Sequence, residues 1–205
     1  MVGKSTNKDY HHGDLRNSLL VVAEDLLRQR GVAGISLREV AKQAGVSHTA
    51  PYRHFRDKEQ LLQALAAVGF RRLATALQGI RDDYEKQPET ALKKGGEAYV
   101  ELAVSHPQLT QLMFGGVLSR DEVSPELAEF GDAAFNALLS LVDLGIAQKL
   151  YRIDDRMTIA LAAWSMVHGL SMLVIAGQLG EYAGTKQAEQ KMAQDVVDVL
   201  LHGLT

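Results

Sequence analysis

Side chains that can form hydrogen bonds to a polyanion or to base edges are concentrated in the nine-residue stretch SHTAPYRHF, residues 47–55. On a helix drawn at about 100° per residue, its polar and aromatic members fall on one side: His48, Thr49, Tyr52 and Arg53. Its smaller or apolar members fall on the other: Ala50, Pro51 and Phe55. One side therefore offers donors and acceptors, and the other can pack on the protein. A helix that lies in a DNA groove requires this division.

Pro51 lies inside this expected helix, where a proline removes a backbone donor and collides with the preceding turn. If Ser47 is the N-cap, Pro51 is only the fourth helical residue, and the amides of the first turn lack helical partners in any case. At most one hydrogen bond, to the Ser47 carbonyl, is lost or distorted. We therefore expect a short helix over residues 47–55 that tolerates Pro51 on its inward face.

The preceding residues predict the helix that positions this segment. Ser36 and Glu39 have the spacing of a capping box, and apolar residues follow up to the turn residue Gly45. A capped helix, a glycine turn and a second short helix form helix-turn-helix geometry. Helix hairpins with a purely structural role share this spacing. The separation of polar and apolar residues on the two sides of residues 47–55 favours DNA binding over a structural hairpin.

Capping residues predict helices along the rest of the chain. Asp14 is expected to cap a helix that ends before Gly31, and Asp57 a longer helix that follows residue 57. Prolines mark later helix starts, and helices are expected near residues 89–105, 107–114, 125–150, 155–178 and 186–203. No segment alternates in the manner of a strand. The prediction is an all-α fold of about nine helices.

Three segments follow from this assignment. Residues 1–13 are expected to be a flexible N-terminal tail, and residues 14–57 a three-helix helix-turn-helix DNA-binding domain. Residues 58–205 are expected to form a helical bundle; that this bundle binds an effector and dimerises is what the family resemblance given below implies. Charge follows the same division: residues 1–58 carry ten Lys and Arg against six Asp and Glu, and the remainder twelve against nineteen. A polyanionic partner is therefore expected at the head.

Composition excludes some chemistry. The chain has no cysteine, so disulfides and thiolate ligands are excluded. The N-terminus has no apolar run typical of a signal peptide, so a cytoplasmic location is expected. Residues 157–180 contain no charged residue and are long enough to span a bilayer. His168 near the middle is costly in lipid, and a basic flank is missing, so a buried helix is the better interpretation.

A ligand pocket in the body is a further hypothesis. Trp164 and His168 are four residues apart and share one helix face, where histidine could anchor a ligand among apolar residues. The alternative, which we favour slightly, is a hydrogen-bonded histidine in a buried helix. Tyr99, Met113 and Phe114 are weaker candidates that could equally be core residues. The histidines lack companions at helical spacing, so no metal site and no cofactor are expected.

The last helix carries two apolar rows. One is expected to pack on the body of the same chain, and the other has no partner there. Paired with the uncharged helix before it, the second row predicts a four-helix dimer interface across a two-fold axis. The expected interface residues are apolar: Met172, Ala176, Met192, Val196, Val199 and Leu200. The alternative is that both rows pack within one chain.

Residues 31–65, GVAGISLREVAKQAGVSHTAPYRHFRDKEQLLQAL, resemble the DNA-binding head of the TetR family of bacterial transcriptional regulators. The specific features are Gly45, the Tyr52-x-His54-Phe55 run and Asp57-Lys58-Glu59. YHHGDLR at residues 10–16 is similar to the lead-in of one branch of that family. WSMVHG at residues 164–169 and HPQLTQLMFG at residues 106–115 are similar to the effector domain of the same branch.

The resemblance implies a homodimer whose heads enter successive major grooves of a palindromic operator, about 34–36 Å apart or more. It implies a repressor released by a small hydrophobic molecule bound in the body. By position, the implied DNA contacts are Arg38, Ser47, His48, Thr49, Tyr52, Arg53, His54 and Lys58. Tyr52, His54 and Lys58 match phosphate contacts, although His54 falls towards the inward side of the helix.

The strongest base contact is expected from Arg53 or Arg38, because neither His48 nor Thr49 can make the bidentate contact that arginine makes with guanine. Two alternatives remain: a DNA-binding regulator that needs no ligand, and an activator. An enzyme is less favoured, since the sequence shows no nucleophile–base spacing and no paired carboxylates.

Overall fold

The computed structural model describes residues 12–119, 122–153 and 155–204. Within these ranges the protein is helical, and no strand occurs. The eight α-helices are α1 (His12–Arg30), α2 (Leu37–Gln43), α3 (Lys58–Asp83), α4 (Pro88–Ser105), α5 (Pro107–Phe114), α6 (Pro125–Ala147), α7 (Arg156–Ile175) and α8 (Lys186–Leu204). Three short 3-10 turns are η1 (Val32–Gly34), η2 (Pro51–Arg53) and η3 (Gly180–Ala183). The all-α prediction is confirmed.

The helix starts follow the capping chemistry. The Ser36 hydroxyl accepts a hydrogen bond from the Glu39 amide at 3.1 Å, and Asp57 accepts one from the Gln60 amide at 2.9 Å. A proline occupies the first turn of α4, α5 and α6, where its missing N–H is not needed. One start differs: α1 begins at His12, two residues before the expected cap Asp14. The predicted tail thus loses its last two residues to α1, and its first eleven lie outside the described residues.

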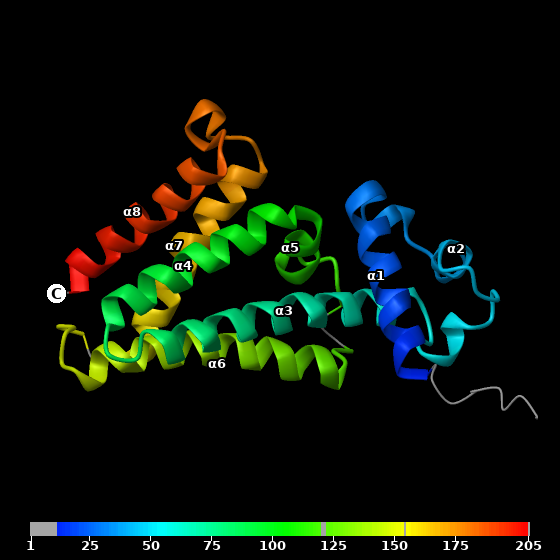
Figure 1. Ribbon diagram of the computed structural model, residues 1–205, viewed down its shortest axis with the longest axis horizontal. Coiled ribbons are helices and arrows are strands. Elements are labelled where there is room, and N and C mark those ends of the chain that lie inside the picture. The colour runs from blue at the N-terminus through cyan, green and yellow to red at the C-terminus, as the bar shows by residue number, and fades with distance from the viewer. Residues whose placement is uncertain (1–11, 120–121, 154, 205) are drawn as a thin grey trace, which may run out of the picture.

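Helix α3 belongs to both parts of the molecule. Its first half, including Leu61 and Leu65, is buried in the core of the head with α1 and α2. Its second half, including Leu73 and Leu77, is buried in the core of the body with α4, α6, α7 and α8. Figure 1 shows α3 running from the head into the body beside α6. One continuous helix therefore connects the two cores, and the boundary expected at residue 57 marks the start of that helix.

The body also reaches into the head core. Leu109 and Leu112 of α5 and Leu127 of α6 are buried together with residues of α1 and α3. The guanidinium of Arg72 on α3 forms two hydrogen bonds with the Glu24 carboxylate on α1, at 2.5 and 2.7 Å. The head is thereby held on the body by apolar and ionic contacts.

Two helices, α6 and α7, are long and apolar enough to cross a membrane by length and composition alone. Core helices of soluble proteins meet the same criterion. On α7, Ile159, Ala160 and Val167 are buried against the rest of the bundle. The opposite side of α7 is exposed at Met157, Leu161 and Leu173, so the helix is buried on one side and not all round as expected.

Candidate DNA-binding surface and ligand cavity

The segment at residues 47–55 is not the α-helix that the sequence predicted. It consists of turns around the 3-10 element η2, and Ala50 rather than Ser47 occupies the N-cap position. The Ala50 amide donates to the Ser47 carbonyl at 3.0 Å, and the His54 amide to the Pro51 carbonyl at 2.9 Å. These bonds connect residues three apart, which is the 3-10 pattern.

Pro51 explains the difference. In an α-helix the residue 51 amide would donate to the Ser47 carbonyl, and proline has no such hydrogen. The Ser47 carbonyl instead accepts the Ala50 amide, which tightens the turn. The preceding turn is built on Gly45, whose φ of 67° favours glycine.

The two sides of the segment are divided as the sequence indicated. Pro51 and Phe55 are buried, whereas the Tyr52 side chain is 50% exposed. The other candidate contacts with solvent-exposed side chains are Arg38, Ser47, His48, Thr49 and Arg53. These five side chains and that of Tyr52 are called the exposed reading set below. Their contact with DNA stays a prediction.

Lys58 and His54 are placed differently from that set. The Lys58 ammonium donates to the Val32 carbonyl in η1 at 2.7 Å, so it ties the start of α3 to the turn after α1. His54 is half-buried, its Nε2 atom is buried, and its ring lies 6.4 Å from that of Phe55. Neither placement favours the phosphate contacts that the resemblance implied. For His54, the inward direction agrees with its position on the expected helix, where it falls towards the inward side.

Below the segment, Phe55 is covered by Arg16 of α1. The guanidinium carbon of Arg16 lies 5.5 Å from the centre of the Phe55 ring, and the same group pairs with Glu126 of α6 at 2.5 Å. Arginine over an aromatic face is attractive. Arg16 thus connects the apolar base of the reading segment to the first turn of α6.

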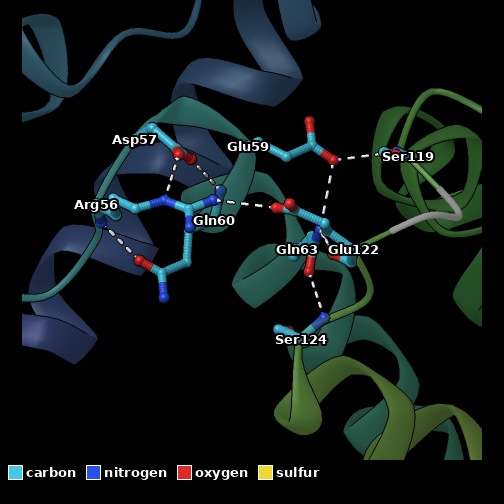
Figure 2. A network of polar contacts seen from close by, with 8 residues as sticks. All are labelled: Arg56, Asp57, Glu59, Gln60, Gln63, Ser119, Glu122 and Ser124. Carbon is cyan, nitrogen blue, oxygen red and sulfur yellow. Dashed lines mark hydrogen bonds and ion pairs between the residues drawn. The ribbon is translucent and has the colours of Figure 1, made fainter.

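A polar network joins the start of α3 to the loop before α6 (Figure 2). The Gln63 side chain is 3% exposed; its Nε2 donates to the Glu122 carbonyl at 2.8 Å, and its Oε1 accepts from the Ser124 amide at 2.7 Å. Glu59 accepts from the Ser119 amide at 3.1 Å. Arg56, next to the reading segment, pairs with Glu122 at 3.4 Å. The loop is therefore fixed to α3 mainly through backbone groups.

A cavity of about 300 Å³ lies within the body. Its walls are almost wholly apolar and come mainly from α3, α4, α6 and α7: Phe70, Leu73, Leu77, Leu92, Gly95, Gly96, Tyr99, Phe114, Gly131, Ala134, Phe135, Leu138, Leu141, Ala163, Trp164, Val167 and Val197. A cavity of this size and composition is typical of a site for a small apolar molecule.

Three of the five predicted ligand residues, Tyr99, Phe114 and Trp164, line this cavity. Met113 and His168 are not among its wall residues. Met113 lies beside Gly69 and packs against the head core. His168 is half-buried, and its Nδ1 lies 2.8 Å from the Tyr99 hydroxyl oxygen. The favoured alternative expected a hydrogen-bonded histidine in a buried helix; the hydrogen bond is present, and the helix is buried on one side only.

The close approach of α4 to its neighbours depends on two adjacent glycines. A Cβ atom at Gly95 would lie 2.7 Å from Leu141 Cδ1, and one at Gly96 would lie 2.7 Å from Val197 Cγ2. Both glycines and both contacted side chains belong to the cavity wall. Sequence reasoning missed these glycines and the aromatic residues Phe70 and Phe135, since helical periodicity does not distinguish a cavity wall from a filled core.

An apolar face remains uncovered on α7 and α8. On α8, Ala193, Val197 and Leu201 are buried in the body, whereas Val199 of the other row is 68% exposed. The expected interface residues Met172, Met192, Val196 and Leu200 are half-buried, and Ala176 is exposed. Sequence reasoning missed Leu161 and Leu173 of α7, which are 44% and 47% exposed. Met192, Val196 and Leu200 of the outer row also pack partly against the body core, which leaves Val199 as the most exposed member of that row. The dimer interface stays a prediction.

Among the described residues, no group of three or more histidine and acidic side chains could hold a metal ion.

Two family models match this architecture. The model of the bacterial regulatory proteins, tetR family, matches residues 19–65, which contain α2, η2 and the reading segment. The model of the tetracyclin repressor-like C-terminal domain matches residues 92–200, over half of the chain. The chain belongs to the TetR family. TetR-family proteins are transcriptional regulators, generally repressors, and not enzymes; they are cytoplasmic, bind DNA operators and typically act as dimers.

Several known proteins are similar to this chain. A protein of unknown function from Rhodococcus sp. RHA1 is 35% identical, and its solved structure has a TM-score of 0.82 over 97% of this chain and 99% of that one. The repressor BepR of Brucella suis is 26% identical over 193 residues, 93% of this chain and 87% of BepR. The regulator EthR of Mycolicibacterium smegmatis is 28% identical over 117 residues, 57% of this chain. That match spans about half, 52%, of EthR.

Proposed function

We propose that this TetR-family regulator is a repressor that binds a palindromic operator as a homodimer and leaves it when a small apolar molecule occupies the body. The observation that carries the proposal is the exposed reading set above the buried Pro51 and Phe55. A rigid apolar base with polar side chains directed outwards suits base reading in a groove. The chain is further proposed to belong to the family branch marked by Trp164, His168 and Gly169.

The exposed reading set supplies two kinds of DNA contact. Arg53 and Arg38 are exposed and can each make bidentate contacts with guanine. Tyr52 and the hydroxyls of Ser47 and Thr49 suit phosphate oxygens, which position the protein without reading sequence. The two hydroxyls lie 3.2 Å apart, so they face a common region in front of the segment.

The dimer is proposed to form through the outer faces of α7 and α8. Val199, Leu161 and Leu173 expose large apolar side chains there. Contiguous exposed apolar surface is characteristic of interaction sites. Two copies of this face, related by a two-fold axis, give a four-helix interface in which each apolar row finds a partner.

The cavity is proposed to be the effector site, and its walls suggest how occupancy reaches the head. Phe70 of α3 and Phe114 of α5 both line the cavity, with ring centres 5.2 Å apart. The same two helices enter the head core through Leu65 and Leu112. A ligand that displaces either ring therefore acts on a helix that also supports α1.

A second connection runs through α6. Phe135 and Ala134 of α6 line the cavity, while the start of α6 is held to α3 by Gln63 and to Arg16 by Glu126. A shift of α6 would therefore reach the Phe55 base of the reading segment. The cavity is thus connected to the head through α3 and α5 and also through α6. Both connections are consistent with a ligand that changes the spacing of the two heads.

The experiment is operator binding in the presence of compounds that occupy the cavity. Fluorescence anisotropy of a labelled operator duplex measures the affinity, and thermal shift measures occupancy. The proposal predicts that stabilising compounds weaken operator binding. Compounds that stabilise the protein and leave operator affinity unchanged would contradict ligand release and favour the ligand-independent alternative.

A further inference from the structure

We propose that the cavity selects an uncharged, largely aromatic molecule of about a dozen non-hydrogen atoms that carries one hydroxyl group, bonded to the Tyr99 phenol. This inference rests on the proposed function, because it specifies the chemical class of the effector for the same site. The volume of the cavity, the composition of its walls and one group of three polar side chains support it.

Volume indicates the size of a ligand that fills the cavity. An apolar cavity of about 150 Å³ holds benzene, which has six non-hydrogen atoms. The cavity of about 300 Å³ is twice as large and accommodates about twice that number. This corresponds to two fused rings with one substituent.

The walls favour an aromatic ligand. The Phe114 and Trp164 ring centres are 5.8 Å apart, and those of Phe135 and Trp164 are 6.1 Å apart. Rings at such separations offer edges and faces to a further ring. The aromatic side chains in the wall are Phe70, Tyr99, Phe114, Phe135 and Trp164.

The same walls disfavour a charged ligand. The wall residues include no lysine, arginine, histidine, aspartate or glutamate. An ion moved from water into such a site would lose its hydration without gaining a counter-charge, which costs far more than the transfer of a neutral group. The effector is therefore neutral when bound.

Tyr99, Trp164 and His168 form the polar group at the wall. The Trp164 Nε1–H donates to the Tyr99 hydroxyl oxygen at 3.4 Å, and the His168 Nδ1 lies 2.8 Å from the same oxygen. Burial raises the pKa of Tyr99 to about 12, so its hydroxyl keeps its proton. Burial also lowers the pKa of His168, which favours the neutral imidazole.

A neutral imidazole has two tautomers, and the tautomer of His168 decides whether the Tyr99 hydroxyl accepts a hydrogen bond from a ligand or donates one to it. If His168 carries its hydrogen on Nε2, Tyr99 donates to Nδ1, and a free lone pair on its oxygen can accept from a ligand. If His168 carries it on Nδ1, the Tyr99 oxygen accepts from His168 and Trp164, and its own O–H can donate to a ligand. A ligand hydroxyl both donates and accepts, so it satisfies either arrangement.

Three probes of similar size test the inference on the full-length protein: 1-naphthol, 1-methylnaphthalene and 1-naphthoate. They place a hydroxyl, a methyl and a carboxylate on the same two rings. Calorimetry gives their dissociation constants for the wild type, for Tyr99→Phe and for Met113→Leu, a matched control outside the cavity wall. A net hydrogen bond of about 1 kcal/mol corresponds to roughly a fivefold affinity ratio.

We expect 1-naphthol to bind the wild type and Met113→Leu about fivefold more tightly than 1-methylnaphthalene. Tyr99→Phe should bring this ratio close to one, and 1-naphthoate should bind most weakly to all three proteins. The order of the three probe affinities for the wild type tests the inference even if Tyr99→Phe fails to fold. Any of four results would overturn the inference. 1-Naphthoate could bind as tightly as 1-naphthol, or no probe could bind. The affinity ratio of 1-naphthol to 1-methylnaphthalene could also be near one for the wild type, or persist in Tyr99→Phe.

Operator affinity measured in the same samples separates the two proposals. The expected probe ranking without loss of operator binding would support the selectivity and contradict ligand release. Tightest binding of 1-naphthoate with loss of operator binding would overturn the selectivity and support ligand release.

Discussion

The side-chain oxygen of Gln63 accepts a hydrogen bond from the backbone amide of Ser124 at 2.7 Å. Ser124 is the N-cap of α6, and its own hydroxyl accepts from the Leu127 amide at 3.3 Å. A buried side chain of α3 thus fixes the residue at which α6 begins. The helix that carries the head core and the helix that lines the cavity are connected at this point.

Replacing Gln63 with leucine should lower the free energy of unfolding by about 1–3 kcal/mol, because the Ser124 amide and the Glu122 carbonyl lose their buried partner. Urea denaturation measures the loss. Gln60→Leu is the matched control, since Gln60 is exposed and accepts one hydrogen bond, from the Arg56 amide. Equal losses in the two variants would show that the buried connection contributes nothing beyond an exposed one.

The two hydrogen bonds between Arg72 and Glu24 should hold α1 on α3 more firmly than a simple surface pair would. Both side chains are partly exposed, at 39% and 21%, so solvent screens the pair. We expect Arg72→Met to cost about 1 kcal/mol and Arg81→Met, whose partner Asp82 is 71% exposed, to cost less. A double-mutant cycle with Glu24→Gln isolates the coupling, and a coupling near zero would contradict this assignment.

Arg53→Ala should weaken operator binding and also relax the preference for operator over random DNA, because Arg53 is the expected base reader. Tyr52→Ala should weaken binding to all sequences alike, as loss of a phosphate contact does. Lys93→Ala in the body is the control. Fluorescence anisotropy with an operator duplex and a random duplex measures the operator affinity and the preference for operator over random DNA. Unchanged affinity and preference in Arg53→Ala would show that another residue reads the bases.

His168 should make stability depend on pH. Its pKa is lowered from 6.5 by burial, so the folded state binds fewer protons than the unfolded chain. Stability is therefore complete above pH 6.5 and falls as the pH drops through that value towards the lowered pKa. Thermal melts between about pH 7.5 and 5.5 should show a larger loss for the wild type than for His168→Gln. Parallel losses would contradict the burial of this imidazole.

Val199→Glu should shift the protein towards the monomer, because it places a charge in the proposed two-fold interface. Val21→Glu is a matched control: Val21 is 62% exposed on α1, comparable with the 68% of Val199. Sedimentation velocity gives the two association states. A dimer in both variants would place the interface elsewhere.

Helix starts could be predicted from the sequence because their chemistry is local. Ser36 and Asp57 cap the helices that their spacing indicated, and Pro88, Pro107 and Pro125 lie in the first turns of theirs. The inward position of Pro51 could also be predicted, since the polar residues His48, Thr49, Tyr52 and Arg53 fall on the other side of the segment. The η2 geometry could not, because it depends on how the Ser47 carbonyl finds a donor once proline cannot supply one.

The cavity and the Gln63 connection depend on contacts between residues far apart in the chain. Tyr99 and Phe114 looked equally suited to a filled core, and only the approach of α4, α6 and α7 decides that they face a cavity. In the sequence Gln63 is one of several polar residues of α3, and nothing marks it as buried. Its function becomes visible when residues 122–124 are placed against it.

The central claim is that the exposed reading set recognises one palindromic DNA sequence. The most direct measurement is selection of bound duplexes from a random-sequence pool, followed by titration of the winner between about 50 and 200 mM salt. We expect an enriched two-fold symmetric sequence whose affinity for the protein falls steeply with salt and is reduced by Arg53→Ala. Recovery of no symmetric sequence, or an affinity that salt leaves unchanged, would contradict it.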